Sequence, residues 1–369
     1  MPKSLFEMVT ATAIASYYEE LASNRIPYLG EALFPSDKKM GLKLEWIKGQ
    51  GHLPVALQPS AFDAKPLVRD RSGVSIESTK MPFFRESMRL GEEDRQQLLM
   101  FLESQNNAYA NSIINRIFND TKELIDSAMV TPEIMRMSLL HSGAFTIAST
   151  SDSGQSVTHQ YNYDPNGTWA TRNNTELTAN SRWSDHAHSN PIKDMLDVKR
   201  QAAGRGISLT RVIIGFETWQ DLLANEKIKL GMYPLANQAA NVIVTDAQVK
   251  TYIETLTGLK IQVYEKMYTG LDGNAEFFYP QRGCATFLTS EALGKTWYGT
   301  TPEEADLMSG NKLADVRVVN TGVAVSTEKI ALPVNIINWV SEIVLPSFEN
   351  MDKVFNLKYD PEAKVEEEA

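Results

Sequence analysis

The pattern of apolar and polar positions early in the chain predicts two strands joined by a long connection. Residues 42–47 alternate between apolar and polar side chains, and residues 74–80 do so more weakly. The connection is rich in Gly, Pro and charges of alternating sign, and it has few positions that would form a core. We therefore predict an extended hairpin that projects from the body. The alternative interpretation is a disordered lid over an active site.

A helical pattern follows this hairpin. Residues 93–122 place most apolar side chains about three or four positions apart, and carboxylates stand at the start, where they favour the positive end of the helix dipole. Thr131 followed by Pro132 is typical of a cap with Pro in the first turn, which predicts a second helix. That second helix should end at Gly143, because Gly is common just beyond a helix C-terminus.

The second half of the chain alternates between helices and strands. Residues 148–190 are rich in Ser, Thr, Asn and Asp, which predicts turns, short strands and exposed loops. Beyond them we expect an α/β or α+β unit with its own core. Its predicted elements are helices at 190–203, 217–225 and 246–256 and strands at 210–215 and 259–264. Two strand-like runs follow at 316–325 and 334–344, before an acidic tail.

Composition narrows the class of protein. The chain has 369 residues, enough for a large core or for two domains, and its formal net charge of -10 gives no support to a surface that grips nucleic acid. The single cysteine, Cys284, excludes an intrachain disulfide framework and a Cys-rich metal site. Because Cys284 opens an apolar run, we predict that it is a buried strand residue. We find no signal peptide or membrane-spanning run, and expect synthesis in a reducing cytoplasm.

Candidate chemistry is sparse. His186 and His188 flank one residue beside Asp185, the one spacing that could chelate a metal, but a stable site needs three or four ligands. We interpret both as solvated or structurally bonded imidazoles. The sequence has no phosphate-binding glycine loop and no serine-hydrolase elbow. We therefore predict no catalytic residue, no cofactor and no metal. The enzyme alternative is a metal-dependent α/β enzyme that uses these two histidines.

A series of short segments in a fixed order carries the most specific signal. They are 60–66 with 69–71, 183–185 with 191–194, 211–215 with 219–223, 294–303, and 333–334 with 345–348. In this order, after an early arm and around a long helix with a Gly-terminated turn, they resemble the lambda-type branch (major capsid protein E) of the tailed-bacteriophage major capsid proteins, which have the HK97 fold. The resemblance covers nearly the whole chain.

The resemblance implies an α+β HK97-like capsid fold and a structural function. Its expected parts are an N-terminal arm (1–40), an extended β-hairpin loop (41–92), a peripheral domain with a long spine helix (93–188), an axial α/β domain (189–309), and closing strands with the acidic tail (310–369). The chain would assemble itself into the icosahedral head shell that encloses the phage genome, with no enzymatic role. The alternative of the same fold is an encapsulin-type nanocompartment shell.

The resemblance also implies partners. Copies of the chain would form pentamers and hexamers with a separate scaffolding protein, a portal and, where one exists, a decoration protein. The shell would be assembled in the host cytoplasm, enclose double-stranded DNA without sequence-specific binding, and have no membrane. The charges around the loop suit contacts that are specific in register rather than strong, because exposed ion pairs contribute little each. The candidate inter-subunit contact residues are Lys65, Arg69, Asp70, Arg71, Glu77, Arg85 and Glu86.

Overall fold

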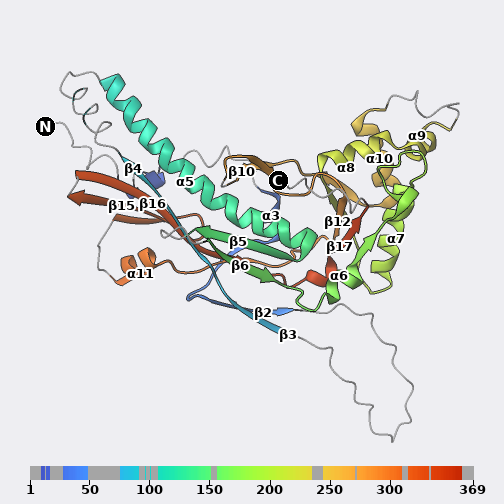
Figure 1. Cartoon of the computed structure of the whole chain (residues 1–369), viewed down its shortest axis with the longest axis horizontal. Coiled ribbons are helices and arrows are strands. Elements are labelled where there is room, and N and C mark those ends of the chain that lie inside the picture. The colour runs from blue at the N-terminus through green and yellow to red at the C-terminus, as the bar shows by residue number, and fades with distance from the viewer. Residues whose placement is uncertain are drawn as a thin grey trace, which may run out of the picture. The chain divides into compact units, whose positions relative to one another are not determined.

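The computed structural model forms two compact units (Figure 1). Unit 1 comprises residues 1–46, 78–135 and 295–347, and unit 2 comprises residues 47–77, 136–294 and 348–369. The structure describes residues 10–12, 14–16, 28–48, 75–90, 96, 100, 107–150, 156–234, 244–270, 272–309, 315–331 and 334–359. The predicted division into five parts is finer than these two units, and it stays a prediction.

Unit 1 is built on a six-stranded sheet in the order β1-β13-β16-β15-β14, with β4 also paired to β16. The strands are β1 (Ser36–Lys38), β4 (Phe83–Leu90), β13 (Thr296–Tyr298), β14 (Asp315–Val319), β15 (Val323–Ala331) and β16 (Val334–Pro346). The helices α3 (Leu29–Leu33) and α11 (Pro302–Ser309) belong to the same unit. One edge of β16 pairs with β15, while its other edge pairs first with β4 and then with β13.

One predicted strand of unit 1 was wrong in extent. The run 316–325 was taken as a single strand, but β14 ends at Val319 and β15 begins at Val323. The chain reverses between them, with Asn320 in the left-handed region at φ 50°. Asn tolerates this conformation, so Asn320 and the nearby Gly322 form a turn inside an apolar run. The predicted strand at 334–344 is confirmed as β16.

The first described residues of the predicted arm pack on β14 of their own chain. Ala11 and Ile14 are buried. The Ala11 N–H donates to Asp315 Oδ2 at 2.9 Å, and Arg317 Nε donates to Thr12 Oγ1 at 3.0 Å. Part of the arm is therefore held within unit 1.

The long helix α5 runs from Asn107 to Ser142 without a break. The predicted new start at Thr131 was wrong, because Pro132 lies inside the helix. An interior Pro costs about 3 kcal/mol, and buried side chains on both sides of it, including Met129 and Met135, offset this cost. The predicted end at Gly143 is confirmed: its φ is +71° and its N–H donates to the Leu139 carbonyl at 3.0 Å. The predicted start near residue 93 lies outside the described residues.

Unit 2 contains a five-stranded sheet in the order β7-β17-β12-β8-β9. The strands are β7 (Asn174–Glu176), β8 (Arg211–Ile214), β9 (Lys260–Val263), β12 (Cys284–Leu288) and β17 (Phe355–Lys358). The helices are α6 (Thr168–Asn173), α7 (Pro191–Ala203), α8 (Phe216–Ala224), α9 (Glu226–Met232) and α10 (Asp246–Thr257), with short turns η1 (Ala179–Ser181) and η3 (Met351–Lys353). One buried apolar cluster joins α7, α8 and α10 to this sheet.

The predicted alternation of helices and strands in this region is confirmed. The predicted helices correspond to α7, α8 and α10, and the predicted strands correspond to β8 and β9. Local signals explain this success. Asn190 caps α7 through its side chain, with Pro191 in the first turn. Thr245 forms a capping box at α10, and Gly258 ends that helix in the left-handed conformation.

Three two-stranded sheets complete the described fold. They are β2 (Lys43–Lys48) with β3 (Ser75–Lys80), β5 (Ala144–Thr150) with β6 (Ser156–Asn162), and β10 (Met267–Thr269) with β11 (Ala275–Phe277). The predicted strands of the hairpin are therefore confirmed and paired. The connection between them, residues 49–74, lies outside the described residues, so its projection from the body stays a prediction.

Candidate functional site

The most enzyme-like cluster of side chains in unit 2 is centred on Asp221 of α8, whose carboxylate is buried. His186 Nε2 lies 3.0 Å from its Oδ1, and Arg282 Nε donates to its Oδ2 at 3.3 Å. The Tyr359 hydroxyl lies 3.1 Å from the same Oδ2 and 3.0 Å from Thr218 Oγ1. Burial raises the pKa of Tyr359, so its hydroxyl stays protonated and serves as a donor. These hydrogen bonds join α8 to Tyr359, which directly follows β17 in the sequence.

The two histidines of the candidate metal motif bind different carboxylates. His186 contacts Asp221, whereas His188 Nδ1 lies 3.0 Å from Asp185 Oδ1. The hydrogen bond from His188 lowers the pKa of Asp185. Across the part of the chain that the structure describes, no group of three or more His, Cys, Asp and Glu side chains could hold a metal ion. Both imidazoles are structurally bonded, as the sequence indicated.

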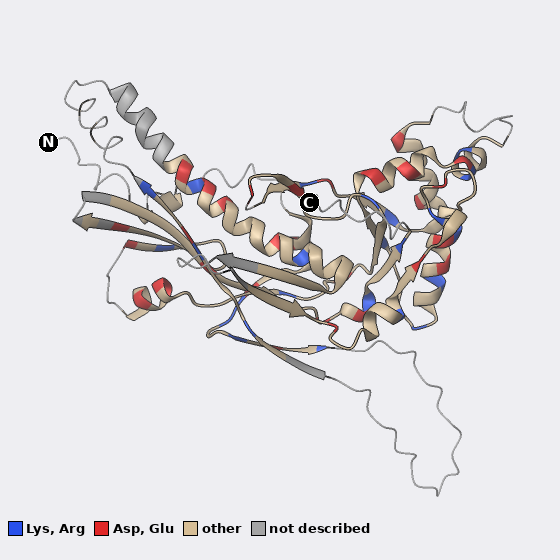
Figure 2. Ribbon diagram, viewed as in Figure 1, with Lys and Arg blue, Asp and Glu red and all other residues tan. Residues whose placement is uncertain are grey.

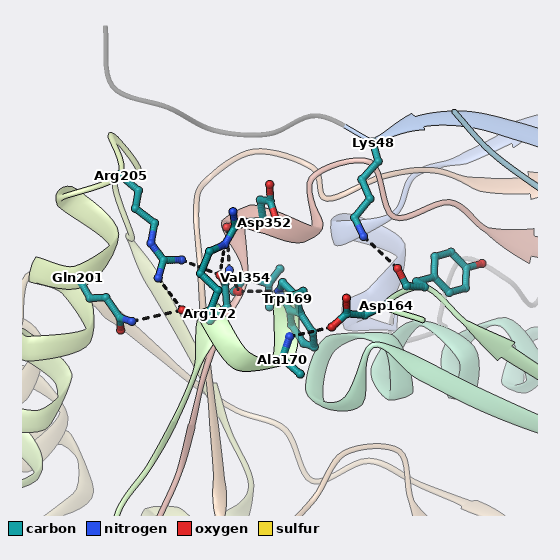
Figure 3. Close-up of polar contacts among 11 residues, drawn as sticks. Lys48, Asp164, Trp169, Ala170, Arg172, Gln201, Arg205, Asp352 and Val354 are labelled. Atoms are coloured by element: carbon teal, nitrogen blue, oxygen red, sulfur yellow. Dashed lines mark hydrogen bonds and ion pairs between the residues drawn. The ribbon is translucent and has the colours of Figure 1, made fainter. Parts of the chain in front are cut away.

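A second polar network ties α6 to η3 in unit 2 (Figure 3). Arg172 forms an ion pair with Asp352, and Arg205 donates to Asn173 Oδ1 at 2.7 Å. The Trp169 indole N–H donates to the Val354 carbonyl at 3.2 Å. These donors satisfy backbone and side-chain acceptors of the chain itself, so the network stabilises the fold.

Unit 1 has a third cluster, at the start of α11. Figure 2 colours the acidic positions of this helix red on the ribbon. Glu303 forms an ion pair with Arg85 of β4 and accepts hydrogen bonds from Ser341 Oγ at 2.8 Å and Trp339 Nε1 at 3.3 Å. Glu304 forms an ion pair with Lys38 of β1. Burial by itself would raise the pKa of Glu303, but its hydrogen bonds and the Arg85 charge hold that pKa below the usual value.

The seven predicted contact residues have different outcomes. Lys65, Arg69, Asp70 and Arg71 lie outside the described residues. Glu77 lies in β3, with only its backbone described. Arg85 and Glu86 are neighbours in β4 and both are exposed, but Arg85 binds Glu303 of its own chain. Their contacts with a neighbouring subunit stay predictions.

Sequence reasoning missed the acidic pair at the start of α11. A sequence signal was present, since Thr301 followed by Pro302 and two glutamates is typical of a helix start. The cationic partners are more than 200 residues away in the sequence, with separations of 266 for Lys38 and 218 for Arg85. No local pattern indicates such pairs.

Comparison with known proteins decides the class. The family model of phage major capsid protein E matches residues 10–320. The chain belongs to this family. A search among curated proteins finds no match. No helix in the described ranges is long and apolar enough to cross a membrane.

Solved structures agree with the family. A protein described as a prophage capsid protein of Escherichia coli CFT073 is 15% identical, with a TM-score of 0.58 over 95% of this chain and 99% of that one. A phage-related protein from Bordetella bronchiseptica RB50 is 11% identical, with a TM-score of 0.54 over 95% and 97%. The chain therefore has the HK97-like capsid fold.

A phage major capsid protein E is a structural subunit of the head shell, and it is part of the virion capsid. Family and fold are those of a structural protein and not of an enzyme. The predicted fold and function are thereby confirmed. The Asp221, Asp352 and Glu303 clusters are accordingly interpreted as interactions that hold the subunit in shape.

Proposed function

We propose that this major capsid protein builds its shell through three kinds of contact between copies. An axial domain, residues 189–309, meets its copies around five-fold and six-fold axes. A peripheral domain tiles the rest of the surface. The arm, residues 1–40, and the hairpin loop, residues 41–92, overlap neighbouring subunits. The observation that carries this proposal is the family match over residues 10–320. The match includes the axial domain, the hairpin loop and most of the arm.

Exposed apolar side chains on the helices of unit 2 are available for the axial contact. Phe216, Leu230, Tyr233 and Leu256 are all more than a third exposed, although they belong to or adjoin α8, α9 and α10. These helices already bury one apolar face in the core of unit 2. Contact between copies around an axis would bury these side chains.

The negative net charge supports a shell that encloses DNA without binding it tightly. The formal charge is -10, with 46 acidic and 36 basic residues. Such a subunit repels the phosphate backbone instead of neutralising it. We propose that a separate scaffolding protein, a portal and, where one exists, a decoration protein are its other partners.

Electron microscopy of the purified protein tests the proposal. The protein is expressed alone and together with a scaffolding protein encoded beside it. Closed polyhedral particles, or rings of five and six copies, are the expected result. A single small oligomer under every condition would contradict the proposal.

The loop is tested in the same assay with Arg69→Ala combined with Arg71→Ala. We expect a large loss of closed particles, because the loop then lacks two charges that set its register on a neighbour. The matched control removes two cations from α7, with Lys193→Ala and Arg200→Ala, both exposed at the surface of unit 2. Equal losses in both variants would show that only total charge matters.

A further inference from the structure

Helix α11 begins with two carboxylates that are turned inward. Thr301 caps the helix: its Oγ1 accepts from the Glu304 N–H at 3.3 Å, and its carbonyl accepts from the Ala305 N–H at 2.9 Å. Glu303 and Glu304 are only 8% and 5% exposed. Buried carboxylates are costly unless they are paired, so their partners matter to the position of everything they touch.

Their partners lie on the two strands that flank the β2–β3 hairpin. Lys38 ends β1, shortly before β2 begins, and it binds Glu304. Arg85 lies in β4, shortly after β3 ends, and it binds Glu303. The chain is therefore held by the first turn of α11 both where it enters the hairpin and where it leaves it.

The base of the hairpin, residues 39–46 and 78–82, is closed by backbone hydrogen bonds. The Met81 N–H donates to the Leu42 carbonyl at 2.8 Å, which joins the two arms of the base. The Lys39 N–H donates to the Tyr298 carbonyl at 2.8 Å, which joins the base to β13. These two amides report directly on whether the base stays in place.

Glu303 is itself held by the central strand β16. Ser341 Oγ donates to its Oε2 at 2.8 Å, and Trp339 Nε1 donates to its Oε1 at 3.3 Å. Ser341 also stands opposite Arg85 in the register of β16 and β4. The Arg85 side chain is thus bound to an acceptor that the sheet fixes, and rotation of the ion pair is restricted.

We propose that Glu303 and Glu304 are positioning residues for shell assembly. With Lys38 and Arg85 they form a clamp, the α11 clamp, which fixes the base of the hairpin in the free subunit. A single attachment would leave a hinge, whereas attachments on both flanking strands hold the base in one orientation. The inference rests on the proposed function, in which the hairpin loop overlaps a neighbour. A base held in one orientation then limits the directions in which each subunit extends its hairpin loop toward a neighbour.

Hydrogen–deuterium exchange of the unassembled subunit tests the clamp without requiring a shell. In Glu303→Gln combined with Glu304→Gln, which removes both ion pairs, we expect exchange of the Lys39 and Met81 amides to become at least about tenfold faster, because the loss of even one charge-assisted hydrogen bond corresponds to roughly that factor. Core amides of β12 in unit 2 should be unchanged. Unaltered exchange at the hairpin base in this folded variant would overturn the proposal.

Variants of Arg85 distinguish the proposed clamp from a general contribution of these residues to stability. Arg85→Gln should accelerate exchange at the base, Arg85→Lys should restore most of the protection, and Arg85→Gln should add little to Glu303→Gln. Additive effects would overturn the pairing. Because Arg85 is exposed, Arg85→Gln and Arg85→Lys test the ion pair even if the glutamate variants do not fold. The matched control is Asp306→Asn, which removes the charge of a partly buried residue on the same helix and should change neither amide.

Particle images then separate the clamp from the proposed function. If the unchanged protein forms no shells, the proposed function fails while the exchange data still decide the clamp. If the unchanged protein forms uniform shells, clamp variants should give fewer closed shells and a broader range of sizes. Uniform shells of normal yield from a variant with a loosened base would overturn the role in assembly.

Discussion

The Trp183 and Tyr359 rings are stacked, with centroids 4.9 Å apart and an angle of 19° between the ring planes. The two residues are 176 positions apart, yet both are fully buried in the core of unit 2. The Trp183 indole donates to Asp194 Oδ2 at 3.0 Å, while the Tyr359 hydroxyl contacts Asp221. The stack therefore joins the entry of the α/β region to the residue that directly follows β17.

Trp183→Ala should destabilise the subunit by about 3–5 kcal/mol, because it removes a large buried ring and leaves a cavity. Tyr359→Phe keeps the stack and removes the hydroxyl beside Asp221, so a smaller loss of about 1–3 kcal/mol is expected. Urea unfolding of the unassembled subunit measures both. Phe277→Ala, at an exposed position of β11, is the control and should cost less than either. Equal losses in all three would contradict the importance of the stack.

Gly143 and Gly167 show two different reasons why a position requires glycine: a positive φ and a lack of space for a Cβ atom. Both have positive φ, +71° and +65°. A Cβ at Gly143 would lie 2.7 Å from Met351 Cε and 2.9 Å from Trp169 Cζ3, whereas one at Gly167 would meet nothing within 4 Å. Gly167→Ala should therefore cost about 1–2 kcal/mol from backbone strain alone. Gly143→Ala should cost clearly more. The free energies of unfolding check this order, and the reverse order would refute it.

The lowered pKa of Glu303 predicts part of the loss of folding stability at acidic pH. Its pKa is lowered in the folded protein, whereas an unfolded Glu has a pKa of about 4.3. The ionised form is thus favoured by folding, and the resulting stability is full above the unfolded pKa and is lost as pH falls through the folded pKa. Glu303→Gln should remove this contribution, so its urea midpoint should fall less than that of the unchanged protein between pH 6 and about pH 3. Parallel pH curves would show that Glu303 does not contribute.

Cys284 should be unreactive in the folded subunit. It opens β12, it is 6% exposed, and burial raises the pKa of its thiol. A thiol reagent attacks the thiolate, so both access and ionisation are limited. We expect one thiol per chain to react in urea and almost none to react in native buffer, as followed by absorbance of the released thiolate. Rapid reaction in native buffer would place Cys284 at a surface.

Much of unit 2 could be predicted from the sequence because its signals are local. The side-chain cap of Asn190, the capping box of Thr245 and the left-handed Gly258 lie next to the helix ends that they define. The end of α5 at Gly143 and the burial of Cys284 follow from equally short patterns. Family membership also lay in the sequence, in the order of short segments, and the match over residues 10–320 confirms it.

Tertiary structure alone decided two features. One is the continuity of α5, and the other is which charged side chains that are distant in sequence form pairs. Pro132 favours a break, but packing on both sides of it outweighs the local cost. The fold shows Arg85 bound to Glu303 of its own chain, a pair that the sequence did not indicate, while its contact with another subunit stays a prediction. Such pairs form only when strands distant in sequence come together, so no periodic pattern of residues marks them. Local propensity determines where elements begin and end, while nonlocal packing determines which charges meet.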